Sequence, residues 1–152
     1  EKVMAERKTS KRGEAMVKGY KDPDSCPIAT LDVEVNLKNR NHAIDEYGYG
    51  PLNPEEDNTE FWKRLGDMWG IDPEEAKTSR CGNCAAFIQT PMMMGCIEKG
   101  LSGHEADKGD TPETKNAKIV SDAANLGYCQ LFHFKCAGAR TCDAWLFGGP
   151  VK

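Results

Sequence analysis

The hydrophobic positions of this chain follow two different periods. From residue 28 to residue 37, apolar and polar residues alternate, and this period of two predicts a strand. Four residues would share its buried face: Leu31, Val33, Val35 and Leu37. A single strand is not stable by itself in water. We therefore expect it to pair with another part of the chain or with another subunit.

Further along the chain, apolar residues return at helical spacing. Asp57 and Glu60 match a capping box, and the helix that follows them is predicted to end at Gly70. Its apolar face consists of Phe61, Trp62, Leu65, Met68 and Trp69. We interpret these side chains as core or docking residues rather than as ligand-stacking groups.

Prolines and glycines mark the remaining boundaries. Residues 47–54 predict a turn-rich linker, because each proline disfavours helix at the residue before it. A second short helix is predicted over residues 73–79, after an Asp-Pro start, and a third over residues 111–127, where glycine ends it. Residues 99–110 predict a solvated loop rather than a cation site, although they contain His104, Glu105, Asp107 and Asp110.

The composition limits how much of the chain can form a regular core. Only 39% of the 152 residues are hydrophobic, and there are 15 Gly and 8 Pro, so long irregular stretches need another means of support. We predict a small irregular α+β fold: a loop-rich, metal- or cluster-stapled domain with short helices and an extended N-terminal arm. The predicted organisation is an arm with one strand over residues 1–45, a linker with short amphipathic helices over 46–78, and a cysteine-rich domain over 79–152.

The charge is unevenly distributed along the chain. Residues 1–21 hold seven Lys and Arg against three Glu, although the whole chain has a formal net charge of −4. With a single aromatic residue in the arm, we favour a solvated or protein-docking tail over nucleic-acid binding. No apolar run is long enough to span a membrane, and the chain does not begin with the apolar core of a signal peptide.

The seven cysteines are the strongest chemical signal in the sequence. We expect the chain to be made in a reducing cytoplasm, where cysteines favour metal binding over a disulfide framework. Cys81 and Cys84 form a C-x2-C pair, and Cys96 and Cys129 would complete a set of four thiolate ligands. That set fits a [4Fe-4S] cluster or, alternatively, zinc. An apolar shell is predicted around it from Phe87, Tyr128, Phe132, Phe134 and Trp145.

Three cysteines lie outside this ligand set. Cys136 and Cys142 would either close a short loop as a disulfide or provide an alternative ligand in place of Cys129. Cys26 is interpreted as a free thiol, and His133 as a histidine of the apolar shell rather than a metal ligand. There is no phosphate-binding loop and no nucleophile–base signature, so we do not expect an enzyme.

The cysteine segments resemble a known family. Cys81-Gly-Asn-Cys84, Gly95-Cys96 and Gly127-Tyr128-Cys129 resemble the ligand pattern of high-potential iron–sulfur proteins, although the gap before Cys129 is longer and implies an insertion over residues 99–118. Together with residues 47–54 and 140–145, they resemble small virion proteins of tailed marine and cyanobacterial bacteriophages.

The resemblance implies a structural role in a virus particle. It implies a virion component of the tail, baseplate or head–tail region that is assembled in the host cytoplasm and present in many copies. Its partners would be other virion proteins, docked through the arm and the helix over residues 58–70, with no membrane involved. Two alternatives remain: an electron-transfer protein that uses the same cluster, and an adaptor stapled by zinc.

Overall fold

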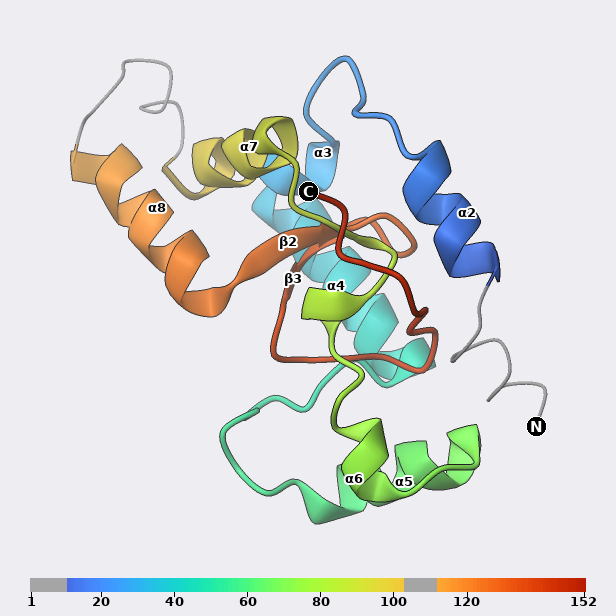
Figure 1. Cartoon of the computed structure of the whole chain (residues 1–152). Helices are drawn as coiled ribbons and strands as arrows, with labels where there is room; N and C mark the ends of the chain where they lie inside the picture. Colours follow the sequence, from blue (N-terminus) through green and yellow to red (C-terminus); the bar gives the residue numbers. More distant parts are fainter. Residues whose placement is uncertain (1–10, 103–111) are drawn as a thin grey trace.

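A computed structural model describes residues 11–102 and 112–152, and only the backbone of residues 112–116 (Figure 1). Helices dominate, and a small three-stranded sheet lies among them. In chain order the elements are α2 (Lys11–Gly19), α3 (Ile28–Leu31), α4 (Val33–Tyr47), α5 (Thr59–Trp69), α6 (Pro73–Ala76), η1 (Cys81–Asn83), β1 (Phe87–Ile88), α7 (Pro91–Ser102), α8 (Pro112–Ala124), β2 (Leu126–Cys129) and β3 (Phe134–Ala137). The predicted small α+β class is confirmed, and helices rather than the expected loops make up about half of the residues that the structure describes.

The predicted strand over residues 28–37 is wrong, because this segment forms α3 and the start of α4. Asp32 separates the two helices in an extended conformation, and its side chain accepts the N–H groups of Glu34 and Val35 at 2.9 and 3.1 Å. This cap begins α4. Val33 and Leu37 then lie four residues apart on one helix face, where they remain 61% and 47% exposed.

The expected extended arm is also replaced by packed helices over residues 11–47. Helix α3 packs against α7, and α4 packs against β3 (Figure 1). Asn36 accepts the backbone N–H of Lys135 at 2.7 Å, and Asn39 donates to the carbonyl of His133 at 2.6 Å. Residues 28–47 are therefore part of the folded body, while residues 1–10 lie outside the described residues.

Helix α5 confirms the helical period read from the sequence. Trp62, Leu65 and Trp69 are at most 2% exposed, and Gly70 ends the helix with a left-handed φ of 70°. The predicted capping box is not formed, because the helix begins at Thr59 after an N-cap residue that makes no side-chain cap.

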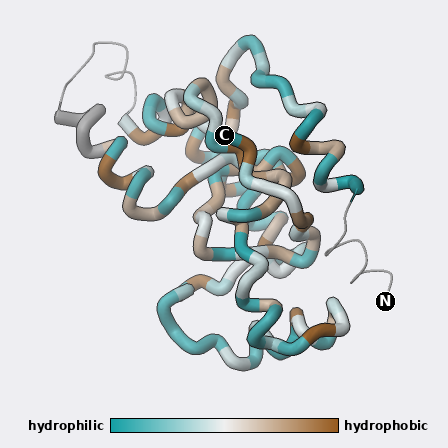
Figure 2. The backbone as a smooth tube through the Cα atoms, in the orientation of Figure 1, coloured by the Kyte–Doolittle hydropathy of each residue, from teal (hydrophilic) through white to brown (hydrophobic). Residues whose placement is uncertain are grey.

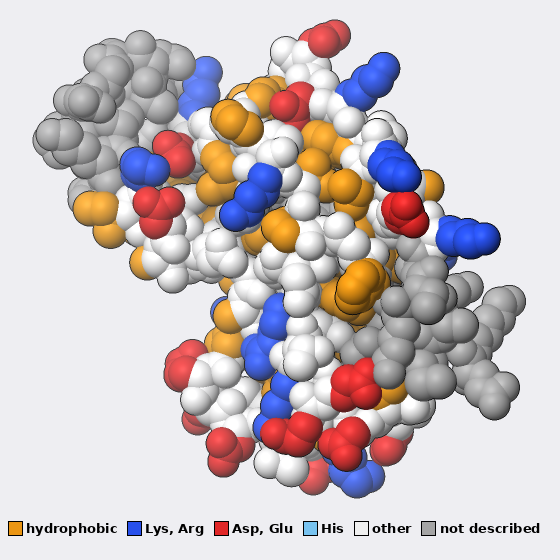
Figure 3. All heavy atoms as spheres, viewed as in Figure 1, with side chains coloured by type: hydrophobic (Ala, Val, Ile, Leu, Met, Phe, Trp, Pro, Cys, Tyr) orange, Lys and Arg blue, Asp and Glu red, His pale blue; other side chains and the backbone are white. Residues whose placement is uncertain are grey.

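The loop before α5, residues 50–58, is mostly polar and appears teal in Figure 2. Many acidic side chains gather at this end of the molecule (Figure 3).

The other predicted helices are confirmed with shifted ends. Helix α6 begins at Pro73, with Asp72 as its N-cap, and ends at Ala76, while α8 ends before Asn125, whose φ is 47°. Helix α7, like the helices over residues 11–47, was not predicted, and it contains residues 99–102 of the predicted loop. The remainder of that loop, with His104, Glu105, Asp107 and Asp110, lies outside the described residues.

The sheet has the order β1-β2-β3, and both pairings are antiparallel. Residue Cys129 pairs with Phe134, and Gly127 pairs with Cys136. Gly127 is required by close packing, since a Cβ atom there would lie 2.5 Å from the ring of Phe87. Paired residues of an antiparallel sheet point to the same face, so the two cysteines share one face.

Two hydrophobic cores lie on either side of β2. The first contains the α5 tryptophans and five cysteines, and we call it the thiol core. The second contains Ile88, Ile97 and Val151 from β1, α7 and the C-terminal segment, and we call it the aliphatic core. Neighbouring residues of β2 divide between them, because Cys129 belongs to the thiol core and Tyr128 to the aliphatic core. Among the described residues, no helix is long and apolar enough to cross a membrane.

Candidate metal centre

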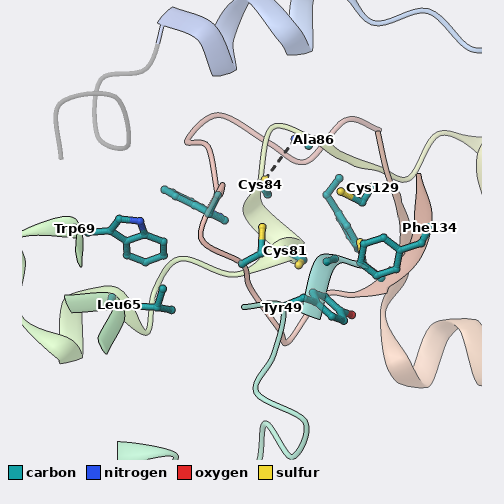
Figure 4. Packing of buried hydrophobic residues seen from close by; sticks show 14 of the residues in the cluster. Tyr49, Leu65, Trp69, Cys81, Cys84, Ala86, Cys129 and Phe134 are labelled. Atoms are coloured by element: carbon teal, nitrogen blue, oxygen red, sulfur yellow. Dashed lines mark hydrogen bonds between the residues drawn. The ribbon is translucent and has the colours of Figure 1, made fainter. Parts of the chain in front are cut away.

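Five free thiols line one cavity in the thiol core. They come from four separate places in the chain, and the other lining side chains are apolar: Ala86, Phe87, Leu131 and Trp145. Figure 4 shows three of the cysteines, Cys81, Cys84 and Cys129, pointing toward the same interior. The remaining two are Cys136 and Cys142, and all five are buried. Thiolates are the ligands of structural zinc and of iron–sulfur clusters, so this cavity is the candidate site.

The C-x2-C segment is held in a tight turn by its own side chains. It forms the short helix η1, and the side chain of Asn83 accepts the N–H of Arg80 at 3.0 Å and donates to the carbonyl of Thr78 at 2.8 Å. This turn brings Cys81 and Cys84 to the same cavity. The asparagine between the two cysteines is therefore a structural part of the site.

Hydrogen bonds join this turn to the segment that contains Cys142. The indole N–H of Trp145 reaches the carbonyl of Arg80 at 2.8 Å and the side chain of Asn83 at 3.0 Å. On the other side of the cysteine, Thr141 pairs with Gly50 through two backbone hydrogen bonds. The Cys142 thiol is thus fixed between the C-x2-C turn and the linker that follows α4.

Backbone N–H groups lie near three of the sulfurs. The N–H of Ala86 donates to the sulfur of Cys84 at 3.5 Å. The N–H groups of Leu131 and Phe132 act on Cys129, and that of Ala144 acts on Cys142, each lowering the pKa of the thiol. In each of these three cases, a donor comes from the residue two positions after the cysteine. Hydrogen bonds of this kind stabilise thiolate ligands and tune iron–sulfur clusters.

Burial opposes ionisation of most of these thiols. It raises the pKa of Cys84 to about 12 and raises the pKa values of Cys136 and Cys142 well above the ordinary value. The pKa of Cys129 is instead lowered, first because the neighbouring Cys136 side chain makes a hydrogen bond to it. A metal binds thiolates, so it must displace these protons and bind more weakly as the pH falls.

The space between the sulfurs is small while all five groups are thiols. It measures about 20 Å³, close to the smallest volume that accommodates one water molecule. No three His, Cys, Asp or Glu side chains in the described part of the chain surround one point closely enough to hold a single ion. The donor chemistry fits a thiolate-bound cluster, and a bound group would replace the present contacts between thiols.

Cys96 is the main correction to the predicted ligand set. It forms a disulfide with Cys26, with Cα atoms 5.5 Å apart, and it lies in the aliphatic core. A sulfur already bonded to another sulfur is not available as a thiolate ligand. The prediction of a free Cys26 is wrong for the same reason. Cys136 and Cys142 form no disulfide in this structure, and both join the site.

The predicted apolar shell is reproduced only in part. Phe87 and Trp145 line the cavity, and Phe134 is buried in the same core. Phe132 packs at the edge of that core, with its ring centroid 4.4 Å from the ring of Tyr47. Tyr128 is wrong as a shell residue, because it points into the aliphatic core.

His133 is also misplaced by the sequence prediction. It lies exposed at the turn between β2 and β3, with a φ of 59°, and its Nδ1 is 3.4 Å from the hydroxyl of Tyr128. It is therefore not part of the apolar shell.

The sequence prediction missed two residues that line the cavity, Ala86 and Leu131, although each stands two residues after a cysteine. That spacing is the sequence signal that would have identified both.

Comparison with family models, with curated proteins and with solved structures finds no match to this chain.

Proposed function

We propose that this protein is a structural component of a bacteriophage particle and that a [4Fe-4S] cluster holds its thiol core together. The main observation in support of a cluster is that five buried thiols, from four places in the chain, converge on one apolar-walled cavity. The resemblance of the cysteine segments to virion proteins supports the location. Iron–sulfur clusters are bound by thiolates in sites of this composition.

Four of the five cysteines are assigned as ligands: Cys81, Cys84, Cys129 and Cys142. All four are 7–9% exposed, so they form the outer wall of the cavity. Three of them receive backbone N–H groups at the sulfur, and the fourth shares the C-x2-C turn. Cys129 keeps the role that the sequence predicted. Cys142, which the sequence offered only as a replacement for Cys129, takes the place of Cys96 in the proposed set.

The role proposed for the cluster is that of a staple. Its ligands would join η1, the end of β2 and the segment around Cys142, which is itself bonded to the linker after α4. In small sites of this kind, the free energy of metal binding contributes directly to folding. Few regular hydrogen-bonded elements connect these segments, and the cluster would replace the support that a larger core provides.

The proposed contacts with neighbouring virion subunits lie on α3 and α4. Four apolar side chains of these helices are 43–65% exposed: Ile28, Leu31, Val33 and Leu37. Helix α5, the other predicted docking element, buries the tryptophans and leucine of its apolar face within its own chain. We therefore assign docking to α3 and α4, in an assembly that contains many copies of the chain.

Metal analysis of protein purified without oxygen tests the cluster. We expect iron and acid-labile sulfide in a one-to-one ratio, with absorbance near 400 nm, and loss of both in Cys84→Ser. Cys26→Ser is the matched control, because it removes a cysteine outside the cavity. Zinc without sulfide would favour the zinc-stapled adaptor, and a chain that is as stable without metal as with it would contradict the staple.

A second experiment tests the virion assignment. The gene is deleted in the phage that encodes it, and the particles are examined by electron microscopy and by mass spectrometry. We expect the chain in wild-type particles and incomplete particles in its absence. Intact infectious particles without the protein would contradict a structural role. Infectivity that follows the oxidation state of the cluster would favour the electron-transfer alternative.

A further inference from the structure

Exposed apolar side chains are concentrated on α3 and the first turns of α4. Elsewhere in the described part of the chain they stand singly or in adjacent pairs along the sequence, as Leu52 and Phe147 do, and such residues are normal on a protein surface. Within residues 28–37, by contrast, four large apolar side chains are 43–65% exposed: Ile28, Leu31, Val33 and Leu37. We call these four the docking patch. A concentration of this kind marks an interaction surface.

One side of α4 is already occupied within the chain. Asn36 and Asn39 are hydrogen-bonded to the backbone of residues 133–135, and Ala43 is fully buried. Because an α-helix has 3.6 residues per turn, Val33 and Leu37 lie on a different face of α4, one turn apart. That face stays exposed in the structure, so it is available to a second molecule.

Two charged residues line the edge of this face. Glu34 directly follows Val33, and Lys38 directly follows Leu37, so a charged pair lies beside the apolar pair. Both charged residues are exposed. Glu and Lys at this spacing commonly form an ion pair on a helix surface, yet neither side chain has an ion-pair partner among the described residues. The two charges are therefore free to meet a partner.

The order of these residues favours a second copy of the chain as that partner. When two α4 helices pack antiparallel about a twofold axis, the charged edge of each helix lies beside that of the other, and its residues run in reverse order. With the apolar pairs of the two helices in contact, Glu34 of each copy lies within one helical turn of Lys38 of the other. A parallel pair would place the two charged edges on opposite sides. The face is thus complementary in charge to a reversed copy of itself.

We propose that the docking patch joins two copies of this chain, with their α4 helices antiparallel about a twofold axis. This inference rests on the docking role that the proposed function gives to α3 and α4, and it identifies the partner. Burial of apolar side chains from both copies stabilises the pair, and the two contacts between Glu34 and Lys38 fix its direction. A twofold axis closes the interface, so this surface joins two copies and no more.

Size-exclusion chromatography with light scattering measures the assembly of the full chain. We expect the wild type, which is 16.8 kDa as a monomer, to form a dimer. Leu37→Asp should weaken dimerisation by at least about 100-fold, because two leucines lose their burial and two carboxylates lose water. Leu52→Asp is the matched control, since Leu52 is 59% exposed outside the docking patch, and it should dimerise like the wild type. Circular dichroism of each variant checks that the helices stay folded.

Charge reversal tests the antiparallel arrangement. Glu34→Lys and Lys38→Glu each place like charges opposite one another, and each should weaken its own dimer by about tenfold. A mixture of the two variants restores both contacts between opposite charges, so native mass spectrometry should show mainly the mixed dimer. Nonspecific association of apolar surfaces would not produce this preference.

A monomeric wild type, a dimer that survives Leu37→Asp, or a mixture without preferential pairing would each overturn this inference. If Leu37→Asp does not fold, the charge-reversed mixture decides alone. Iron and sulfide content of the same samples tests the proposed cluster separately, because a dimer without iron would contradict the staple and leave the docking patch intact. A monomeric wild type that retains iron would remove the second copy and leave the cluster standing.

Discussion

The two cores of this protein are closed in different ways. The thiol core brings five free cysteines together around a cavity, while the aliphatic core contains one disulfide among Ile88, Ile97 and Val151. The disulfide links the segment before α3 to α7, and this link requires no bound metal or cofactor. The thiol core, in contrast, contains free thiols, and burial there raises the pKa values of Cys84 and Cys136.

This difference shows how seven cysteines are used within one chain. An odd count leaves at least one cysteine unpaired, and the structure separates one disulfide pair from five thiols. The Cys26–Cys96 disulfide lies in the core on the other side of β2, so exchange with the thiols of the cavity would require the chain to open. Separation in space allows one chain to contain both kinds of sulfur chemistry.

The largest expected effect is the loss of a ligand in the thiol core. Cys84→Ser should abolish metal binding and destabilise the fold by about 5 kcal/mol, a third or more of the stability of a typical domain. Iron analysis and thermal unfolding followed by circular dichroism measure the two effects on the same sample. The comparison of the two cores would fail if this variant bound no metal and melted like the wild type.

Loss of the disulfide should cost less and should leave the metal in place. Cys26→Ser opens a link between residues separated by 70 positions, for which chain entropy predicts about 4 kcal/mol. Denaturant unfolding under oxidising conditions gives this value, and iron content gives the state of the thiol core. Cys96→Ser should behave in the same way. Iron loss in either variant would show that the two cores are not independent.

A smaller effect is expected at the boundary between sheet and cavity. Gly127→Ala places a Cβ atom 2.5 Å from the ring of Phe87, and overpacking of this kind costs about 2 kcal/mol. Gly95→Ala is the matched control, because an added Cβ there meets nothing within 4 Å and alanine favours a helix. Chemical denaturation of both variants makes the comparison, and equal stability would argue against close packing at Gly127.

The smallest effect is a pH dependence that only the metal-free protein should show. Burial raises the pKa of Cys84 from 9.0 to about 12. A thiol with a raised pKa in the folded state contributes stability that is complete below pH 9 and is lost as the pH rises toward 12. The loss approaches about 1.4 kcal/mol per pH unit for this group. Unfolding curves from pH 8 to pH 10 measure it, and over this range the loss reaches about 1.4 kcal/mol.

The metal-loaded protein is the control for this pH dependence. Its ligand thiols have already lost their protons, so its stability should change little over the same range. A metal-free protein with no loss of stability above pH 9 would contradict the burial of Cys84. A loaded protein that is destabilised in parallel would show that other groups dominate the alkaline transition.

Local patterns predicted the helices whose apolar period was long and clear. Trp62, Leu65 and Trp69 recur at the spacing of an α-helix, and all three are buried on α5. The ten residues from 28 to 37 were wrongly predicted as a strand, because a short alternation of apolar and polar residues also occurs where a capped helix begins. Asp32 decides between the two structures by capping α4, and a period of two does not detect a cap.

The convergence of Cys81 and Cys84 on one cavity was predicted correctly, because sequence spacing reflects local geometry there. Cys81 and Cys84 share one turn, so their convergence follows from two intervening residues. Cys96 was assigned by its order in the chain, but its partner Cys26 lies in a segment that sequence reasoning treated as an unpacked arm. Once that segment folds as helices against α7, the disulfide becomes possible. Long-range packing therefore decided which cysteines meet.

The adjacent positions of Tyr128 and Cys129 on β2 have a consequence for folding errors. Side chains alternate between the two faces of a strand, so a shift of β2 by one residue would exchange the phenol and the thiol. Such a mispaired chain would present a bulky ring where the fourth sulfur is needed, and it would bind the cluster poorly. In a chain stapled as proposed, acquisition of the cluster would therefore check the register of β2, because only correctly paired chains would gain its stabilisation.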